Sequence, residues 1–210
     1  KRNEFKVHYQ AQVNAKTHQL VGMEALIRWQ HPVDGIITPD QFLPIAEEIG
    51  LMEDIDDWVL EQACTQALSW LTQLQPTGRE FTIAVNLSAS QIGNENLFDK
   101  IVNTLTKTGL PAVALELEIT ENCLIEDPHE HAKMLDRIAE LGVRFALDDF
   151  GTGFSSLEHI KLFPISVLKI DKSFVASYDK DDKDTRLLAA LLNFAHGFNV
   201  ISVAEGVETI

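Results

Sequence analysis

Cysteine is scarce in this chain of 210 residues, which has two, Cys64 and Cys123. They lie far apart and form no C-x-x-C pair, which argues against a structural zinc site and against a disulfide framework. Long apolar runs are also missing: none reaches the roughly 18 residues that a membrane helix needs. The N-terminus lacks the basic-then-apolar order of a signal peptide. We therefore predict a soluble, cytoplasmic domain with reduced cysteines, and leave open that the full protein is membrane-anchored.

Basic residues are few relative to acidic ones, with 17 Lys and Arg against 32 Asp and Glu and a net charge of -15. A surface of this sign repels polynucleotide phosphate, so we predict no polynucleotide partner. A small anionic ligand would need local help from a few placed cations, from helix N-termini or from bound metal ions. The charge therefore does not exclude a small phosphorylated substrate.

The length and the 45% hydrophobic content allow one sizeable core, so we treat residues 1–210 as one domain. The chain begins at Lys1 rather than at a methionine, and residues 1–6 resemble the tail of an upstream segment. We therefore expect a domain that is part of a longer protein.

The first part of the chain predicts a β-hairpin followed by a helix. Val7–Val13 and Leu20–Ile27 are largely apolar, the first with regular alternation, and a polar stretch separates them. Residues 31–39 contain proline and glycine and predict a loop. Asp40 is the predicted N-cap of a helix that runs to Ile49.

From there short apolar strands alternate with helical stretches, which predicts parallel β-α units. The expected strands are Thr82–Asn86, Ala114–Thr120, Val143–Asp148, Val167–Ile170 and Asn199–Ala204, and the expected helices are Asp54–Leu74, Ile101–Thr108, Pro128–Leu141 and Thr185–Phe198. With the hairpin, the strand number comes close to that of a barrel. No strand is followed by a G-x-G-x-x-G turn, so we favour a TIM-like (β/α)8 barrel over an open doubly wound sheet.

Nearly every predicted strand ends in an ionisable or amide residue. These residues are Glu24, Asn86, Glu118, Glu121, Asp148, Asp149, Lys169 and Glu205. Each alone is typical of a solvated charge or a helix cap. In a parallel barrel, however, the C-terminal strand ends meet on one face, where so many carboxylates would repel one another unless cations neutralised them. Oxygen-rich clusters of this kind are the ligands that magnesium and manganese prefer.

The adjacent carboxylates Asp148 and Asp149 could bridge two such ions, about 4 Å apart, which together could bind phosphate oxygens and activate water. Lys169 would then hold the attacking water or stabilise charge that develops on phosphorus. A salt bridge within the cluster is the alternative interpretation of Lys169.

Six short motifs of the chain resemble those of the EAL domains, the phosphodiesterases that linearise cyclic di-GMP. The first is E-A-L-I-R at Glu24–Arg28, where the family has E-A-L-x-R. The others are N-L-S at 86–88, E-I-T-E at 118–121, D-D-F-G-T-G at 148–153, K-I-D at 169–171 and A-E-G-V-E at 204–208. The resemblance keeps the family's order and spans almost the whole chain.

The resemblance implies a set of metal ligands and catalytic groups. Glu24, Asn86, Glu118 and Asp148 would bind one metal ion. Asp148 would bridge to a second ion, which Asp149 would bind, as would Glu205 directly or through water. Lys169 would orient the nucleophilic water, and Glu205 would also assist its deprotonation.

The resemblance also implies substrate contacts. Arg28 would hold a phosphate, Leu26 would contact the ligand, and Gln10 would contact a guanine or another part of the ligand, although Ala11 replaces the proline of the family's Y-Q-P segment. The loop from Asp149 to Ser156 would shape the second metal site and often the dimer contact. Glu121 and Glu208 would stabilise that loop.

The implied activity is hydrolysis of cyclic di-GMP to linear pGpG with two Mg²⁺ or Mn²⁺ ions, with Ca²⁺ inhibitory because its coordination is longer and looser. The alternatives are a catalytically weak cyclic di-GMP receptor and a barrel hydrolase for another phosphodiester. A homodimer and an upstream sensor or cyclase domain are the other partners implied. The chain departs from the family by stopping at Ile210, so we expect a barrel without its final strand, its final helix and the family's Q-G-Y-x-F segment.

Overall fold

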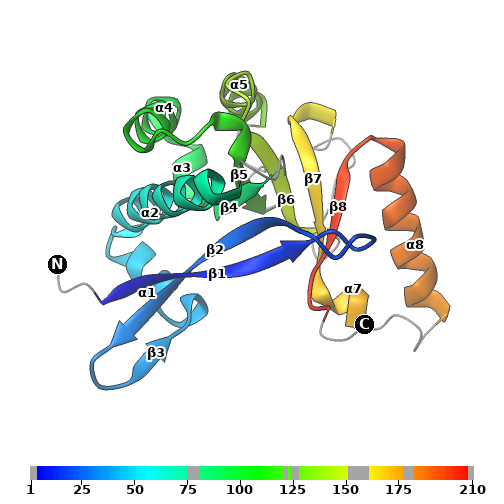
Figure 1. Ribbon diagram of the computed structural model, residues 1–210, viewed down its shortest axis with the longest axis horizontal. Coiled ribbons are helices and arrows are strands. Elements are labelled where there is room, and N and C mark those ends of the chain that lie inside the picture. Colours follow the sequence, from blue (N-terminus) through cyan, green and yellow to red (C-terminus); the bar gives the residue numbers. More distant parts are fainter. Residues whose placement is uncertain are drawn as a thin grey trace. The chain divides into compact units, whose positions relative to one another are not determined.

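The computed structural model describes residues 4–74, 81–120, 123, 128–150, 161–176 and 182–207 of the chain. It divides into two compact units. The first comprises Lys1–Leu117 and Leu141–Val143, and the second comprises Glu118–Glu140 and Arg144–Ile210. The elements of each unit are labelled in Figure 1.

The first unit opens with the predicted hairpin and continues into a β-α arrangement. Its strands are β1 (Phe5–Val13), β2 (Leu20–His31), β3 (Gly35–Ile37) and β4 (Thr82–Asn86). Its helices are α1 (Pro39–Glu48), α2 (Met52–Leu74), α3 (Ala89–Ile92), α4 (Leu97–Thr108) and the 3-10 turn η2 (Ala112–Ala114). β1 and β3 pair antiparallel with β2, whereas β4 pairs parallel with it.

Helix α2 covers the strands of this unit with one apolar face. Its buried residues recur at helical spacing, at Ile55, Val59, Leu60, Ala63, Cys64 and Ala67. Trp70 of the same helix meets Tyr9 of β1 edge-on, with the ring centroids 4.8 Å apart. β4 is buried from Thr82 to Val85 and becomes exposed at Asn86, as expected for a parallel strand whose C-terminal end leaves the core.

The strand β5 (Leu115–Thr120) begins in the first unit and ends in the second. The second unit continues with α5 (Pro128–Ala139), β6 (Arg144–Phe150), β7 (Ile165–Ile170), α7 (Lys172–Ala176), α8 (Asp182–Gly197) and β8 (Ile201–Ala204). β7 pairs parallel with both β6 and β8. α8, orange in Figure 1, connects β7 to β8 and lies beside β8.

The described core of the second unit contains residues of β6 and β7 together with Ala132, Leu135 and Ile138 of α5 and Ala195 of α8. β7 is buried continuously from Val167 to Ile170. On β6, Phe150 stacks on Phe194 of α8 with the ring centroids 6.0 Å apart. The β-α-β order and the parallel pairing confirm the prediction made from alternating strands and helices.

Several local predictions are wrong. The segment 31–39, predicted as a loop, contains the short strand β3, and the short helices α3 and α7 were not predicted. Thr38, not Asp40, precedes helix α1. The reason is Pro39, whose fixed φ and missing N–H suit the first helical position, so Asp40 lies inside the first turn instead. The cysteine prediction is confirmed, since Cys64 and Cys123 are both free and buried.

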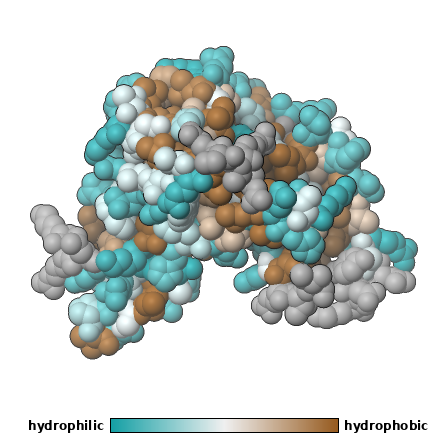
Figure 2. Space-filling view, in the orientation of Figure 1, coloured by the Kyte–Doolittle hydropathy of each residue, from teal (hydrophilic) through white to brown (hydrophobic). Residues whose placement is uncertain are grey.

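The surface of the described residues includes one apolar tip. Figure 2 shows hydrophobic side chains at the end of the β2–β3 hairpin, where Val33 and Ile36 are 84% and 60% exposed. Among the described residues, no helix combines the length and the apolar composition that crossing a bilayer requires.

Candidate active site

The hairpin places four predicted residues on one face. Gln10 of β1 lies opposite Glu24 of β2. Because side chains alternate along a strand, Leu26 and Arg28 share the face of Glu24, while Ala25 between them is buried. The residues that the sequence assigned to substrate therefore lie beside the first predicted metal ligand.

Glu24 and Asn86, predicted to share a metal ion, lie together in the first unit. Glu24 is opposite Ala84 in the parallel pair of β2 and β4, and Asn86 ends β4 two residues later. The side-chain amide of Asn86 donates to Oε1 of Glu24 over 3.4 Å. At this length the hydrogen bond is weak.

In the second unit, Lys169 is buried among carboxylates. Its side chain is 2% exposed, and Nζ lies 2.8 Å from Oε2 of Glu118, 3.0 Å from Oε1 of Glu205 and 3.1 Å from Oδ1 of Asp148. Glu118 is fully buried, whereas Asp148 and Glu205 are 14% and 27% exposed. Of the two interpretations of Lys169, the salt bridge within the cluster is the arrangement that the structure has.

The cluster has more negative than positive charge. The carboxylates of Asp148, Asp149 and Glu205 offer oxygen atoms that all lie within 4.8 Å of one another. With Glu118 they make four carboxylates, while Lys169 is the ammonium at their centre. Hard oxygen donors at this spacing fit divalent ions such as magnesium and manganese, which would also neutralise the excess charge.

Asp149 has an unusual backbone that helps to form the cluster. Its φ is +54°, in the left-handed region that aspartate adopts more readily than most residues. The pairing of β6 with β7 shifts register between Leu147 and Phe150, and the amide of Asp149 donates to Oδ1 of Asp148 over 2.9 Å. A regular strand would point Asp148 and Asp149 to opposite faces, so this bulge allows both carboxylates to serve one site.

The pKa of Asp149 is raised above its usual value. Burial is the main cause, and the negative charges of Asp148 and Asp171 add to it. Lys169 and Lys172 act in the opposite direction. A carboxylate that is costly to ionise in this way gains from a bound cation.

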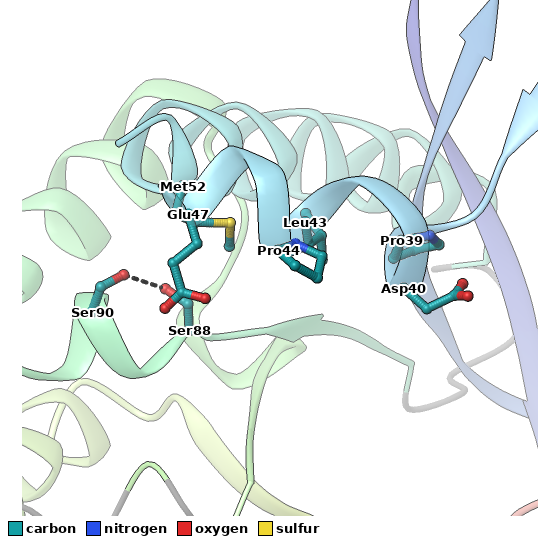
Figure 3. Close-up of a pocket in the computed structure, with 8 residues that line it drawn as sticks. All are labelled: Pro39, Asp40, Leu43, Pro44, Glu47, Met52, Ser88 and Ser90. Carbon is teal, nitrogen blue, oxygen red and sulfur yellow. Dashed lines mark hydrogen bonds between the residues drawn. The ribbon is translucent and has the colours of Figure 1, made fainter. Parts of the chain in front are cut away.

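A separate pocket of about 320 Å³ lies in the first unit. Figure 3 shows its lining residues, Pro39, Asp40, Leu43, Pro44, Glu47, Met52, Ser88 and Ser90. The hydroxyl oxygens of Ser88 and Ser90 are 3.0 Å apart, and Ser88 donates to Oδ2 of Asp56 over 2.6 Å. Burial raises the pKa of Asp56 to about 6, against the effect of the Ser88 hydrogen bond.

Sequence reasoning missed Asp56 because it lies within a helix rather than at a strand end. Ser88, which lines this pocket, is the last residue of the N-L-S motif. That motif is the feature of the sequence that could have pointed to the pocket.

The predicted site residues fall into two groups. Glu24 and Asn86 lie in the first unit, with Gln10, Leu26 and Arg28, while the other predicted metal ligands and Lys169 lie in the second. Glu121, Glu208 and residues 151–156 of the predicted loop lie outside the described residues.

The model of the EAL domain family matches residues 1–210 of the chain. An uncharacterized signaling protein of Caulobacter vibrioides is 45% identical over 207 residues, which are 99% of this chain and 25% of that protein. The bifunctional diguanylate cyclase/cyclic di-GMP phosphodiesterase MucR of Pseudomonas aeruginosa is 41% identical over 208 residues, which are 99% of this chain and 30% of MucR. The chain thus spans between a quarter and a third of the length of these relatives.

Solved structures of EAL domains are also similar to this chain. The MucR phosphodiesterase in complex with cyclic di-GMP superposes with a TM-score of 0.92 at 41% identity, over 99% of this chain and 83% of that one. The EAL enzyme Bd1971, bound to cAMP and cyclic di-GMP, has a TM-score of 0.93 at 31% identity, over 99% of this chain and 56% of that one. These likenesses confirm the predicted fold class, an α/β fold of the TIM-like barrel type.

Proposed function

Because the chain belongs to the EAL domain family, we propose that it hydrolyses one phosphodiester bond of cyclic di-GMP to give linear pGpG. Two divalent ions, magnesium or manganese, would be its cofactors. Cyclic di-GMP is the ligand in the solved complex of the related MucR phosphodiesterase.

The observation that supports this proposal most is the Lys169 cluster, because it combines an excess of carboxylates with a buried cation. Metal ions bound there would polarise the phosphate and lower the pKa of water. Asp148, Asp149 and Glu205 are close enough to share such an ion. A domain that only binds the dinucleotide would have no evident need of this arrangement.

Each unit would contribute metal ligands. In the first unit these would be Glu24 and Asn86. In the second unit they would be Glu118, Asp148, Asp149 and Glu205.

Two residues of the second unit would act on the attacking water. Lys169 would donate from Nζ and orient it, which also stabilises charge that develops on the phosphate. Glu205 would accept its proton, since it is the most exposed of the three carboxylates paired with Lys169.

The hairpin face would supply the substrate contacts. Arg28 would pair with a phosphate, which matters in a chain of net charge -15. Gln10 and Leu26 would contact the guanine side of the ligand. All three lie on the face of Glu24, so substrate bound there would lie beside the first metal ligands.

The direct test incubates the chain with cyclic di-GMP and Mg²⁺ or Mn²⁺ and follows the product by chromatography. We expect pGpG to accumulate, and to stop accumulating when EDTA removes the metal. Glu24→Gln is the inactive control, and Glu48→Gln, an exposed glutamate of the same unit, is the matched active one.

A parallel binding measurement separates the alternatives. Binding of cyclic di-GMP without pGpG formation at any metal concentration would identify a receptor domain. Hydrolysis of other phosphodiesters at the same rate would instead indicate a less selective hydrolase.

The wider setting of the domain is part of the same proposal. The relatives are three to four times longer than this chain, which supports an upstream sensor or cyclase domain in the full protein. A cytoplasmic location is also part of the proposal, and the free cysteines Cys64 and Cys123 suit such a reducing compartment. Homodimer formation remains a prediction that size-exclusion chromatography can test.

A further inference from the structure

Gly206, which directly follows the cluster residue Glu205, occupies a position that a side chain cannot enter without displacement. Its φ is +69°, in the left-handed region. A Cβ atom added there would lie 2.6 Å from Cβ of Lys172 and 3.4 Å from its Cα. Real Cβ atoms do not approach other atoms within 3.0 Å, so one of the two chain segments would have to move.

The backbone of Lys172 cannot easily move away from Gly206, because it lies in a capped turn. It is the first residue of α7 and follows Asp171. Oδ1 of Asp171 accepts from the amide of Ser173 over 2.9 Å, and the carbonyl of Asp171 accepts from the amide of Phe174 over 3.1 Å. The contact with Gly206 is made by Cβ of Lys172, not by the far end of its flexible side chain.

Glu205 lies between this contact and the end of the sheet. Its amide donates to the carbonyl of Ile170 over 3.1 Å, and the preceding Ala204 is paired with Ile170. Its carboxylate pairs with Lys169 and belongs to the group of oxygens with Asp148. A shift of the backbone at Gly206 would therefore move this carboxylate within the cluster.

We propose that Gly206 is a positioning residue for Glu205: its close packing on Lys172 fixes the distance between the end of β8 and the start of α7. That distance sets where the Glu205 carboxylate meets Lys169 and the aspartates. The consequence for metal binding and turnover rests on the proposed function, whereas the effect on the Glu205 backbone does not.

The test is a set of variants in the full chain that separates the steric contact from charge. Gly206→Ala is introduced into the parent, into Lys172→Gly and into Lys172→Ala. Both Lys172 backgrounds lack the ammonium, but only Lys172→Gly lacks the Cβ that the new methyl would meet. Mn²⁺ affinity is measured by electron paramagnetic resonance titration, and thermal unfolding is recorded for every variant.

We expect Gly206→Ala to weaken Mn²⁺ binding by roughly 10-fold to 100-fold in the parent, the range for a group that orients a metal ligand. The loss of Mn²⁺ affinity caused by Gly206→Ala should be as large in the Lys172→Ala background and clearly smaller in the Lys172→Gly background. Lys172→Gly will restore the affinity only in part, because alanine at positive φ keeps its backbone strain. Turnover of cyclic di-GMP should fall mainly through kcat, with KM less affected.

A second measurement keeps the inference separate from the proposed function. Hydrogen exchange of the Glu205 amide, followed without metal, should be faster in Gly206→Ala than in the parent, and slower again when Lys172→Gly is added. If the parent binds no Mn²⁺, the proposed function fails, and the exchange data alone decide whether Gly206 positions Glu205. The inference is overturned if Gly206→Ala leaves exchange at Glu205 unchanged. It is equally overturned if Lys172→Ala rescues as well as Lys172→Gly, or if thermal stability falls while Mn²⁺ affinity does not.

Discussion

The two groups of site residues differ in their burial and in the kind of contact described for them. In the first unit, Glu24 accepts a 3.4 Å hydrogen bond from Asn86, and Asn86 is exposed. In the second unit, Lys169 is buried and makes three ion pairs of 2.8 to 3.1 Å. A buried ion network of this kind is sensitive to the loss of a partner, whereas a long, exposed hydrogen bond contributes little to stability.

This difference leads to separate expectations for variants of the two groups. The Lys169 cluster has its own cation, so its carboxylates are arranged without metal, although with excess negative charge. The contact between Asn86 and Glu24 instead joins a neutral amide to a partly exposed carboxylate over 3.4 Å. Variants of the Lys169 cluster should therefore affect folding and catalysis together, and variants of Glu24 or Asn86 mainly catalysis.

The largest effect is expected for Lys169→Ala. Loss of the ammonium should lower kcat by roughly 10²-fold to 10³-fold, because in the proposed mechanism Lys169 would donate to the attacking water and stabilise the charge that develops on the phosphate. It should also lower the free energy of unfolding by about 3–5 kcal/mol, because Glu118 would stay buried without its cation. Steady-state kinetics and urea unfolding measure the two effects.

Two further variants sharpen this prediction. Lys161→Ala changes an exposed lysine of the same unit and should behave like the parent. The double variant Lys169→Met with Glu118→Gln removes both charges and should be more stable than Lys169→Ala while remaining inactive. Parent-like stability of Lys169→Ala would contradict the difference drawn between the two units.

Glu24→Gln should lower turnover by at least about 10²-fold, since in the proposed site Glu24 would be a direct metal ligand, which matters no less than the groups that orient one. Its free energy of unfolding should stay within about 0.5 kcal/mol of the parent, because the side chain is partly exposed. The same kinetic and urea measurements apply. A large loss of stability would show that the first unit holds its site residues as firmly as the second.

Calcium should bind but suppress turnover relative to magnesium. Its longer and more variable bonds would misplace the two ions relative to the carboxylates that Lys169 already fixes. Product formation in Mg²⁺ at increasing Ca²⁺ measures the effect. Equal rates in the two metals would count against metal-assisted hydrolysis at this cluster.

The smallest effect concerns Asp56, a partly buried carboxyl of the first unit. Burial raises its pKa to about 6 from 3.8, so the folded chain binds this proton more tightly than the unfolded chain. The resulting stability is present at low pH and is lost as pH rises through about 6. Asp56→Asn should therefore gain about 1–2 kcal/mol relative to the parent at neutral pH, and little in mild acid.

Thermal or urea unfolding at two pH values, below and above that pKa, tests the Asp56 prediction. Asp54→Asn, an exposed aspartate in the same helix, is the matched control and should show no such pH-dependent difference. If Asp56→Asn is destabilised at neutral pH, the hydrogen bond from Ser88 outweighs the burial of the charge.

Residue type and periodicity determined much of this protein without tertiary information. Alternating apolar strands and helices predict parallel β-α units because a strand buried on both faces must be largely apolar, as β4 is from Ile83 to Val85. Polar residues at the strand ends follow from the same burial, since Asn86 comes where the strand leaves the core. The pairing of Glu24 with Asn86 was predictable for this reason.

Tertiary structure alone decided the features that depend on neighbours distant in sequence. The left-handed backbone of Asp149 arises at a register shift against β7, which strand periodicity does not encode. The burial of Lys169 depends on carboxylates from three other segments, and the raised pKa of Asp56 depends on packing around α2. The need for glycine at 206 likewise comes from the position of Lys172. Local sequence sets backbone preference and polarity, but burial, ion pairing and close approach are set by which segments the fold brings together.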